Sequence, residues 1–247
     1  MARILFPLPT RDFDPTEAAV PWAELRRRGH EVCFATPDGL RAMADPRMVE
    51  GTGLGPWRGL LQADRHGREA YAALSASPEF GQPLSYAQAT TMSFDGLVLA
   101  GGHAPGMREY LESGAVQALV ADAFAREQPV GAICHGVLVV ARSRDAEGRS
   151  LLHGRQTTAL PASMELTAWA LTAAWLGRYY RTYPQTVQAE VTAVLARVAD
   201  FHPGPLALRR DAPSHLERGF TVRDGHYLSA RWPGDAHRFA IDYADLY

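Results

Sequence analysis

The stretch VGAICHGV, residues 130–137, decides the fold that the sequence predicts. Its first four residues are small or apolar, as expected for a buried central strand of a parallel sheet, and Cys134 follows them directly. Ala132 and Gly136, two positions to either side, are small enough to permit a strained turn that lifts a side chain above the sheet. A helix over 135–143 is predicted to begin after this turn. We therefore expect a nucleophile elbow that presents a reactive cysteine.

The two cysteines of the chain have different surroundings. At a helix N-terminus the dipole and the free N–H groups would favour the thiolate of Cys134 and lower its pKa. The alternative is the inert, buried thiol that is the commonest fate of a free cysteine, and Cys33 in the apolar strand 31–36 fits that description. Two cysteines cannot form a disulfide framework or a Cys-rich metal site, although one disulfide joining them stays open. A reducing cytoplasm is the simplest location.

Strand and helix patterns alternate along most of the chain, which predicts an α/β fold. We expect a flavodoxin-like, doubly wound, mostly parallel sheet with helices on both faces. The predicted strands cover 2–8, 31–36, 94–100, 129–133 and, more briefly, 155–160. The predicted helices cover 15–29, 64–76, 105–113, 115–127, 135–143, 162–176 and 185–198.

The end of the chain predicts a hairpin that turns at Asp224-Gly225, followed by a closing helix over 235–246. A Pro-rich loop is expected over 202–213. Two long excursions, about 37–93 and 177–218, read as cap insertions over the strand ends of a single domain that spans 1–247.

Composition excludes several classes of function. The chain has 247 residues and a net charge of -2, so it offers no general attraction for nucleic acid or an anionic membrane. Its apolar runs are far below the roughly 20 residues that cross a bilayer, and MARILFPLP at the start is too short for a secretory signal. All 25 basic residues are arginine, which excludes a lysine Schiff base and the usual pyridoxal phosphate anchor.

Asparagine is also absent, so a Cys-His-Asn triad is excluded. The nine histidines include no HExxH motif and no tight cluster. We expect neither a metal nor a cofactor, and a small molecule as the substrate.

Three motifs in this order resemble the ThiJ/PfpI superfamily of class I glutamine-amidotransferase-like folds. They are PTEAAVP at 15–21, LVLAGGHAP at 97–105 and GAICHG at 131–136. The segment REAYAALSASPEFGQPLSY at 68–86 looks like the cap insertion of the glyoxalase III and heat-shock chaperone-like branch.

The resemblance implies roles for three residues. Cys134 matches the reactive cysteine, and Glu17 matches the acidic residue that hydrogen-bonds its sulfur. A protonated carboxyl there would donate to the thiolate or carry a proton to and from substrate, whereas the alternative is a plain first-turn helix acid. His135 matches the histidine that pairs with the cysteine, and the alternative is a solvent-facing histidine in the first helical turn.

The glycine pair after the strand 94–100 suggests an oxyanion hole. Gly101 and Gly102 let the backbone approach the elbow, so that the N–H groups of Gly102 and His135 would bind an oxyanion. The alternative is an ordinary strand-to-helix turn. His103 is expected to line the pocket.

The acid that would orient His135 is missing. Ala162 stands where one branch of the family has an aspartate, and Glu165, three residues later, is the substitute candidate. The alternative for Glu165 is a capping or ion-pairing acid in the first turn of helix 162–176.

These residues favour a cofactor-independent lyase or hydrolase that acts on small reactive carbonyls. The reaction that the resemblance implies is glyoxalase III-like conversion of methylglyoxal to lactate through a hemithioacetal on Cys134, or related hydratase or deglycase chemistry. Two alternatives are a cysteine amidase or peptidase, and a non-enzymatic stress chaperone or redox sensor in which Glu17 holds an oxidised Cys134. A homodimer is expected from the resemblance.

Overall fold

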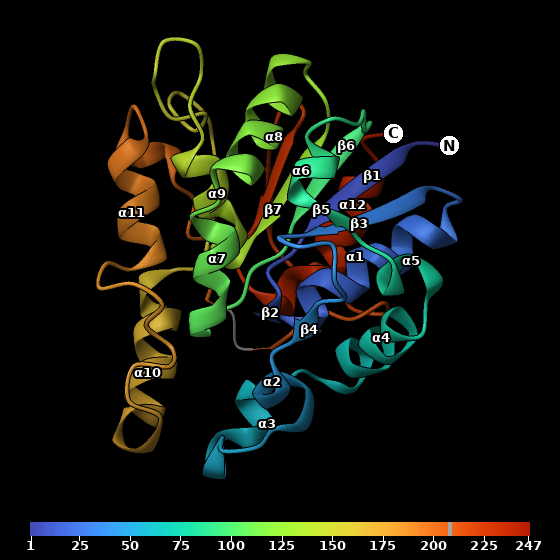
Figure 1. The fold of residues 1–247 in the computed structure, drawn as a ribbon. Coiled ribbons are helices and arrows are strands. Elements are labelled where there is room, and N and C mark those ends of the chain that lie inside the picture. Colours follow the sequence, from blue (N-terminus) through green and yellow to red (C-terminus); the bar gives the residue numbers. More distant parts are fainter. Residues whose placement is uncertain (207–208) are drawn as a thin grey trace.

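The computed structural model describes residues 1–206 and 209–247, and its centre is a seven-stranded sheet with the order β5-β3-β1-β6-β7-β9-β8 (Figure 1). Neighbouring strands are parallel except β8 and β9, which form an antiparallel hairpin. The inner order β3-β1-β6-β7-β9 is the flavodoxin-like arrangement, so the predicted doubly wound fold is confirmed. The strands are β1 Arg3–Pro7, β3 Glu31–Thr36, β5 Leu84–Ser85, β6 Gly96–Leu99, β7 Val130–Ile133, β8 Thr221–Asp224 and β9 Tyr227–Ala230. A second, two-stranded sheet pairs β2 Arg11–Phe13 with β4 Met43–Ala44.

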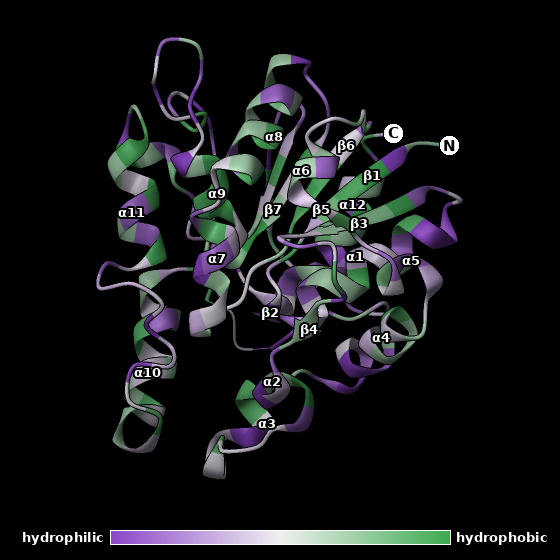
Figure 2. Cartoon of the chain, in the orientation of Figure 1, coloured by the Kyte–Doolittle hydropathy of each residue, from purple (hydrophilic) through white to green (hydrophobic). Residues whose placement is uncertain are grey.

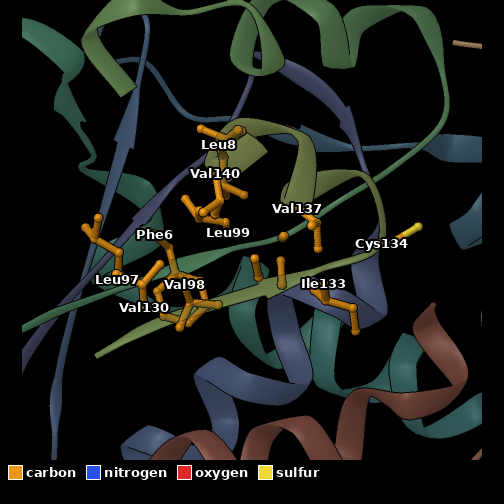
Figure 3. Close-up of a cluster of buried hydrophobic side chains, with 14 of the residues drawn as sticks. Phe6, Leu8, Leu97, Val98, Leu99, Val130, Ile133, Cys134, Val137 and Val140 are labelled. Atoms are coloured by element: carbon orange, nitrogen blue, oxygen red, sulfur yellow. The ribbon is translucent and has the colours of Figure 1, made fainter. Parts of the chain in front are cut away.

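The core lies around the central strands β6 and β7, in which every residue is buried. Figure 2 shows the apolar residues gathered in these strands, and Figure 3 shows Val98, Leu99 and Val130 packed with Phe6 from β1. Strands covered on both faces need no alternation of polar and apolar residues, which explains their continuous apolar sequence.

Helices cover both faces of the sheet (Figure 1). On one face α1 Pro15–Arg27 packs against α12 Ala236–Ala244, and on the other α8 Gly114–Ala125 packs against α9 Val137–Arg142. The remaining helices are α2 Pro46–Glu50, α3 Arg58–Leu61, α4 Arg65–Ser75, α5 Pro78–Gly81, α6 Tyr86–Ala89, α7 Arg108–Leu111, α10 Ala162–Leu176 and α11 Val187–Val194. Short 3-10 turns are η1 Gly55–Trp57, η2 Pro105–Met107, η3 Cys134–Gly136, η4 Val198–Asp200, η5 Leu216–Arg218 and η6 Pro233–Asp235. No helix among the described residues is long and apolar enough to span a bilayer.

The predicted strand 31–36 and helix 162–176 agree with β3 and α10 to the residue. The predicted strand near 155–160 is wrong. Only one parallel bridge, Thr157 to Phe201, forms there. The physical reason is that the Thr158 N–H is donated to the Ser229 side chain, at 2.9 Å, and not to a strand ladder.

Several element boundaries also differ. The predicted helix 185–198 covers only Val187–Val194, because Leu195 is already extended. The hairpin turns at Gly225 and His226, one residue later than predicted, because Asp224 still pairs with Tyr227 in the ladder. The predicted helix 105–113 is divided into η2 and α7, and the predicted helix 135–143 begins with η3 and continues as α9. Residues 207–208 of the predicted loop 202–213 lie outside the described residues.

A second, smaller apolar cluster lies beyond the sheet, where α10 and the α2–α3 segment meet (Figure 1). Its buried members are Met48, Leu54 and Tyr180. The Trp175 indole N–H, from α10, donates to the Gly53 carbonyl at 2.8 Å and joins the two segments. This cluster supports the outer side of the cavity described below.

Candidate active site

Cys134 stands on a strained turn at the end of β7. Its φ is +58°, in the left-handed region that a non-glycine residue adopts only at a cost of about 1–3 kcal/mol. Gly136 allows the turn to pack against β6, because a Cβ there would lie 2.1 Å from the Leu99 carbonyl oxygen. Figure 3 shows the Cys134 side chain past the apolar cluster, at the end of the strand. The backbone of the elbow, and not side-chain packing alone, therefore sets the position of the sulfur.

His135 is buried, and both of its ring nitrogens have partners. Nδ1 lies 3.5 Å from the Cys134 sulfur, and Nε2 lies 3.2 Å from the Thr182 hydroxyl oxygen. The Thr182 hydroxyl has one hydrogen, which it donates to the His103 carbonyl at 2.6 Å, so it must accept from Nε2–H. This assigns the tautomer: Nδ1 presents a lone pair to the thiol. Burial, with smaller contributions from the nearby His103 and Arg142, lowers the pKa of His135 to about 3, so the ring is neutral.

Glu17 brings a fully buried carboxyl to the same place. Asp14 caps α1 by accepting the N–H groups of Thr16 and Glu17, at 2.8 and 3.1 Å. Glu17 Oε2 accepts the Gly101 N–H at 2.7 Å, while Oε1 has no partner in the described part of the chain. Burial and the charge of Asp14 raise the pKa of Glu17 well above its usual value, and the hydrogen bond from the Gly101 N–H opposes them.

The pKa of Cys134 is raised well above its usual value, so the expected lowering is wrong. Burial is the largest cause, followed by the negative charges of Glu17 and Asp14. The His135 N–H that bonds the sulfur lowers the pKa but does not outweigh them. The physical reason is that Cys134 is only 3% exposed and lies near two carboxyl groups, and together these effects outweigh what the start of the helix formed by η3 and α9 gives the thiolate.

The glycine pair lies against the elbow. A Cβ on Gly101 would be 2.7 Å from both the His135 nitrogen and Glu17 Oε2. Gly102 has φ of +151° and lines the cavity together with Cys134. His103 lines it as well, with its ring stacked on Tyr180 at 4.2 Å between centroids.

Glu165 does not orient His135, because other groups occupy both ring nitrogens. Its Oε2 accepts the Val187 N–H at the start of α11, at 2.9 Å, and its Oε1 pairs with Arg181 at 3.2 Å. The capping and ion-pairing alternative therefore describes Glu165. The group that holds His135 is Thr182, which sequence reasoning missed because it lies in a segment without a clear pattern.

A cavity of about 290 Å³ opens above the sulfur, at the carboxyl ends of the central strands. On the side of the sheet it is lined by Asp14, Glu17, Gly102, His103 and Cys134. We call its opposite side the outer wall, which consists of Met48, Leu60, Leu61, Met164, Ala168, Leu171 and Tyr180. Leu206, Arg210, Trp232 and Pro233 close a further side. The arrangement can hold a small, largely apolar molecule next to a nucleophile, a neutral imidazole and a carboxyl group.

Cys33 takes no part in this site. It is half-buried on β3, where the Arg3 guanidinium donates to its sulfur at 3.2 Å, and both cysteines are free. In the described residues no three His, Cys, Asp or Glu side chains are grouped to hold a metal ion.

Comparisons with known proteins place residues 8–195, more than half of the chain, in a family described as ThiJ/PfpI family-like. An uncharacterized protein of Schizosaccharomyces pombe is 32% identical over 117 residues. That match covers 47% of this chain and 42% of the yeast protein, so the chain matches less than half of that relative.

Solved structures of similar fold extend over nearly the whole chain. The 24 kDa rapid encystment protein of Francisella tularensis has a TM-score of 0.73 and 16% identity, and the match covers 100% of this chain and 99% of that one. Glyoxalase III of Candida albicans has a TM-score of 0.65 and 17% identity, and the match covers 100% of this chain and 97% of that one. DJ-1beta of Drosophila melanogaster has a TM-score of 0.59 and 18% identity, and the match covers 99% of this chain and 89% of that one. At these identities the likeness concerns the fold.

Proposed function

The chain belongs to the ThiJ/PfpI-like family, and from that premise we propose that it is a cysteine-dependent enzyme that acts on small reactive carbonyl compounds, as a glyoxalase III does. The proposal is carried by one observation. Cys134 and the Glu17 carboxyl line one cavity, and His135 Nδ1 lies 3.5 Å from the Cys134 sulfur. This set supplies a nucleophile and two proton carriers, which is what hemithioacetal chemistry needs.

Because burial disfavours both a free thiolate on Cys134 and a free imidazolium on His135, proton transfer and addition to the carbonyl occur together. As the sulfur bonds to the aldehyde carbon, His135 Nδ1 takes the thiol proton, and the carbonyl electron pair moves to oxygen. Thr182 holds the Nε2–H of the resulting imidazolium. The N–H groups of Gly102 and His135 are the proposed donors to the oxyanion. His135 then returns its proton to give the hemithioacetal.

With a 2-oxoaldehyde the reaction continues by isomerisation. The hydrogen on C1 leaves as a proton to the Glu17 carboxylate, the hydroxyl proton passes from the C1 oxygen to the C2 oxygen, and Glu17 returns its proton to C2. These proton shifts convert the hemithioacetal to the thioester of a 2-hydroxy acid. Water cleaves the thioester and frees the thiol. A raised pKa makes the Glu17 carboxylate a stronger base for this proton than an ordinary carboxylate.

The test is methylglyoxal consumption with lactate formation. Wild type is compared with Cys134→Ala, Glu17→Gln and His135→Ala, and Cys33→Ser is the control. We expect Cys134→Ala to lose at least about a thousandfold in kcat/KM and the control to match wild type. Turnover that survives in Cys134→Ala would contradict the proposal. If wild type does not turn over methylglyoxal but its Cys134 is still alkylated, Cys134 is a nucleophile and the glyoxalase assignment is wrong. Amide and isonitrile substrates would then be tested.

The amidase and chaperone alternatives have different support. A peptidase needs an open cleft, and the outer wall leaves room for a small molecule only. A stress chaperone is favoured by exposed apolar side chains on η1, α3 and α10, namely Trp57, Leu60, Leu166, Trp169 and Trp175. Scattering from a heated client protein tests that function, and sedimentation tests the expected homodimer, for which the same face is a candidate.

A further inference from the structure

Five residues that line one cavity each have a buried polar side-chain atom with no hydrogen-bond partner among the described residues. These atoms are Glu17 Oε1, His103 Nε2, Tyr180 OH, Arg210 Nη1 and Trp232 Nε1. Buried polar atoms in folded proteins almost always have a partner. Their convergence on one space indicates that a bound molecule supplies the missing hydrogen bonds.

Two of these atoms form a pair of donors. The Arg210 guanidinium lies over the Trp232 ring, 5.2 Å from its centroid, and Nη2 donates to the Gln62 carbonyl at 3.2 Å. These contacts hold the planar group in place at the cavity wall, while Nη1 has no partner among the described residues. Arg210 Nη1 and Trp232 Nε1 can only donate, so the pair requires an acceptor.

The charge of Arg210 has no ion-pair partner of its own among the described residues. Three carboxyls line the same cavity, but each is engaged elsewhere: Asp14 caps α1, Glu17 lies at the thiol, and Glu165 pairs with Arg181. Arg210 is near enough to lower the pKa of Asp14 and Glu17, and yet it bonds neither. A positive charge partly removed from water favours an anionic ligand.

We propose that Arg210 and Trp232 bind a carboxylate of the substrate, which therefore carries a reactive carbonyl at one end, an apolar body and a carboxylate at the other. The two donors match the two oxygens of a carboxylate, whereas a phosphate would need more. The body lies against the outer wall. A cavity of about 290 Å³ is close to the roughly 300–1,000 Å³ typical of ligand pockets, and a three-carbon aldehyde would leave most of it empty. The substrate class rests on the proposed function.

Binding to the Cys134→Ala protein tests the subsite without turnover. The probes are 3- and 4-formylbenzoate, each compared by calorimetry with its methyl ester, which keeps the aldehyde and the ring but removes the charge. We expect at least one acid to bind about tenfold more tightly than its ester. Adding Arg210→Gln should erase this preference, and the matched control Arg209→Gln, an exposed neighbour, should keep it.

Trp232→Phe keeps the ring under Arg210 and removes one donor, so the preference should fall about threefold to tenfold. Equal binding of acids and esters, or a preference that survives Arg210→Gln, overturns the subsite. If the acid binds more tightly than its ester but wild type turns over no aldehyde, the carboxylate subsite is supported and the proposed reaction is contradicted.

Discussion

The elbow, residues 130–136, is held by backbone, whereas the outer wall of the cavity is held by side chains. At the elbow, a single added methyl on Gly136 or Gly101 would collide with a backbone or carboxyl atom at 2.1–2.7 Å. In the wall, α10 meets the α2–α3 segment through a small apolar cluster, and Leu60, which lines the cavity from α3, is 54% exposed. The proposed chemistry is thus tied to atoms that no substitution can move at small cost, while the proposed substrate preference would depend on side chains that can be exchanged.

The largest effect is expected from Gly136→Ala. The new Cβ, 2.1 Å from the Leu99 carbonyl oxygen, should push the elbow from β6 and destabilise the fold by about 3 kcal/mol. Gly59→Ala in α3 of the wall region has no atom within 4 Å of its Cβ and should change stability by no more than about 1 kcal/mol. Denaturant unfolding measures both. Equal effects would mean that the two regions do not differ in rigidity.

Thr182→Val comes next, because this side chain joins the two regions. It follows α10 and yet holds His135 in the elbow. Valine keeps the shape but leaves Nε2 without an acceptor, so we expect kcat to fall about 10- to 100-fold with little change in KM. Thr182→Ser should restore most of the rate, and ring NMR of His135 should report loss of the Nε2–H tautomer in the valine variant alone. A serine variant as slow as valine would point to packing instead.

Thiol reactivity should depend on pH in a way that reflects the wall. Because burial raises the pKa of Cys134, the thiolate fraction is small at neutral pH. As long as the pH stays below that pKa, the fraction grows with each unit of increase in pH. In a Cys33→Ser background, iodoacetamide alkylation should therefore rise about tenfold per pH unit from pH 6 to about 9. The alkylation rate of free cysteine, measured in parallel, should level off near the pKa of that thiol, about 8.5. A plateau near neutral pH would mean that the wall does not desolvate the sulfur.

The same contrast explains what the sequence can predict. The sequence signal for β7 and the turn after it is local. It consists of an apolar run, a cysteine and small neighbours within eight residues, and these residues form the predicted strand and turn. Helix 162–176 is equally local and ends at Gly177, which has φ of +57°. Signals of this kind need no knowledge of the rest of the molecule.

Contacts between distant segments were beyond such reasoning. Thr182 and His135 are 47 residues apart, and the Thr182 segment has no periodicity to indicate where it packs. Glu165 was chosen for its nearness to a missing aspartate, but the fold brings Arg181 to it. The direction of the Cys134 pKa shift was wrong for the same reason, since it is decided by burial under residues far away in the chain.

The smallest expected effect concerns one side chain of the wall. Met164 lines the cavity from α10, while Leu166 on the same helix is 39% exposed to solvent. Met164→Ala removes apolar contact that ground state and transition state share, so KM for an aromatic aldehyde should rise several-fold, about 1 kcal/mol, with kcat unchanged. For methylglyoxal, which is too small to reach across the cavity, neither constant should change, and Leu166→Ala should match wild type with both substrates. A fall in kcat for Met164→Ala would mean that the wall positions the reacting groups, and the division between a backbone-held elbow and an exchangeable wall would not hold.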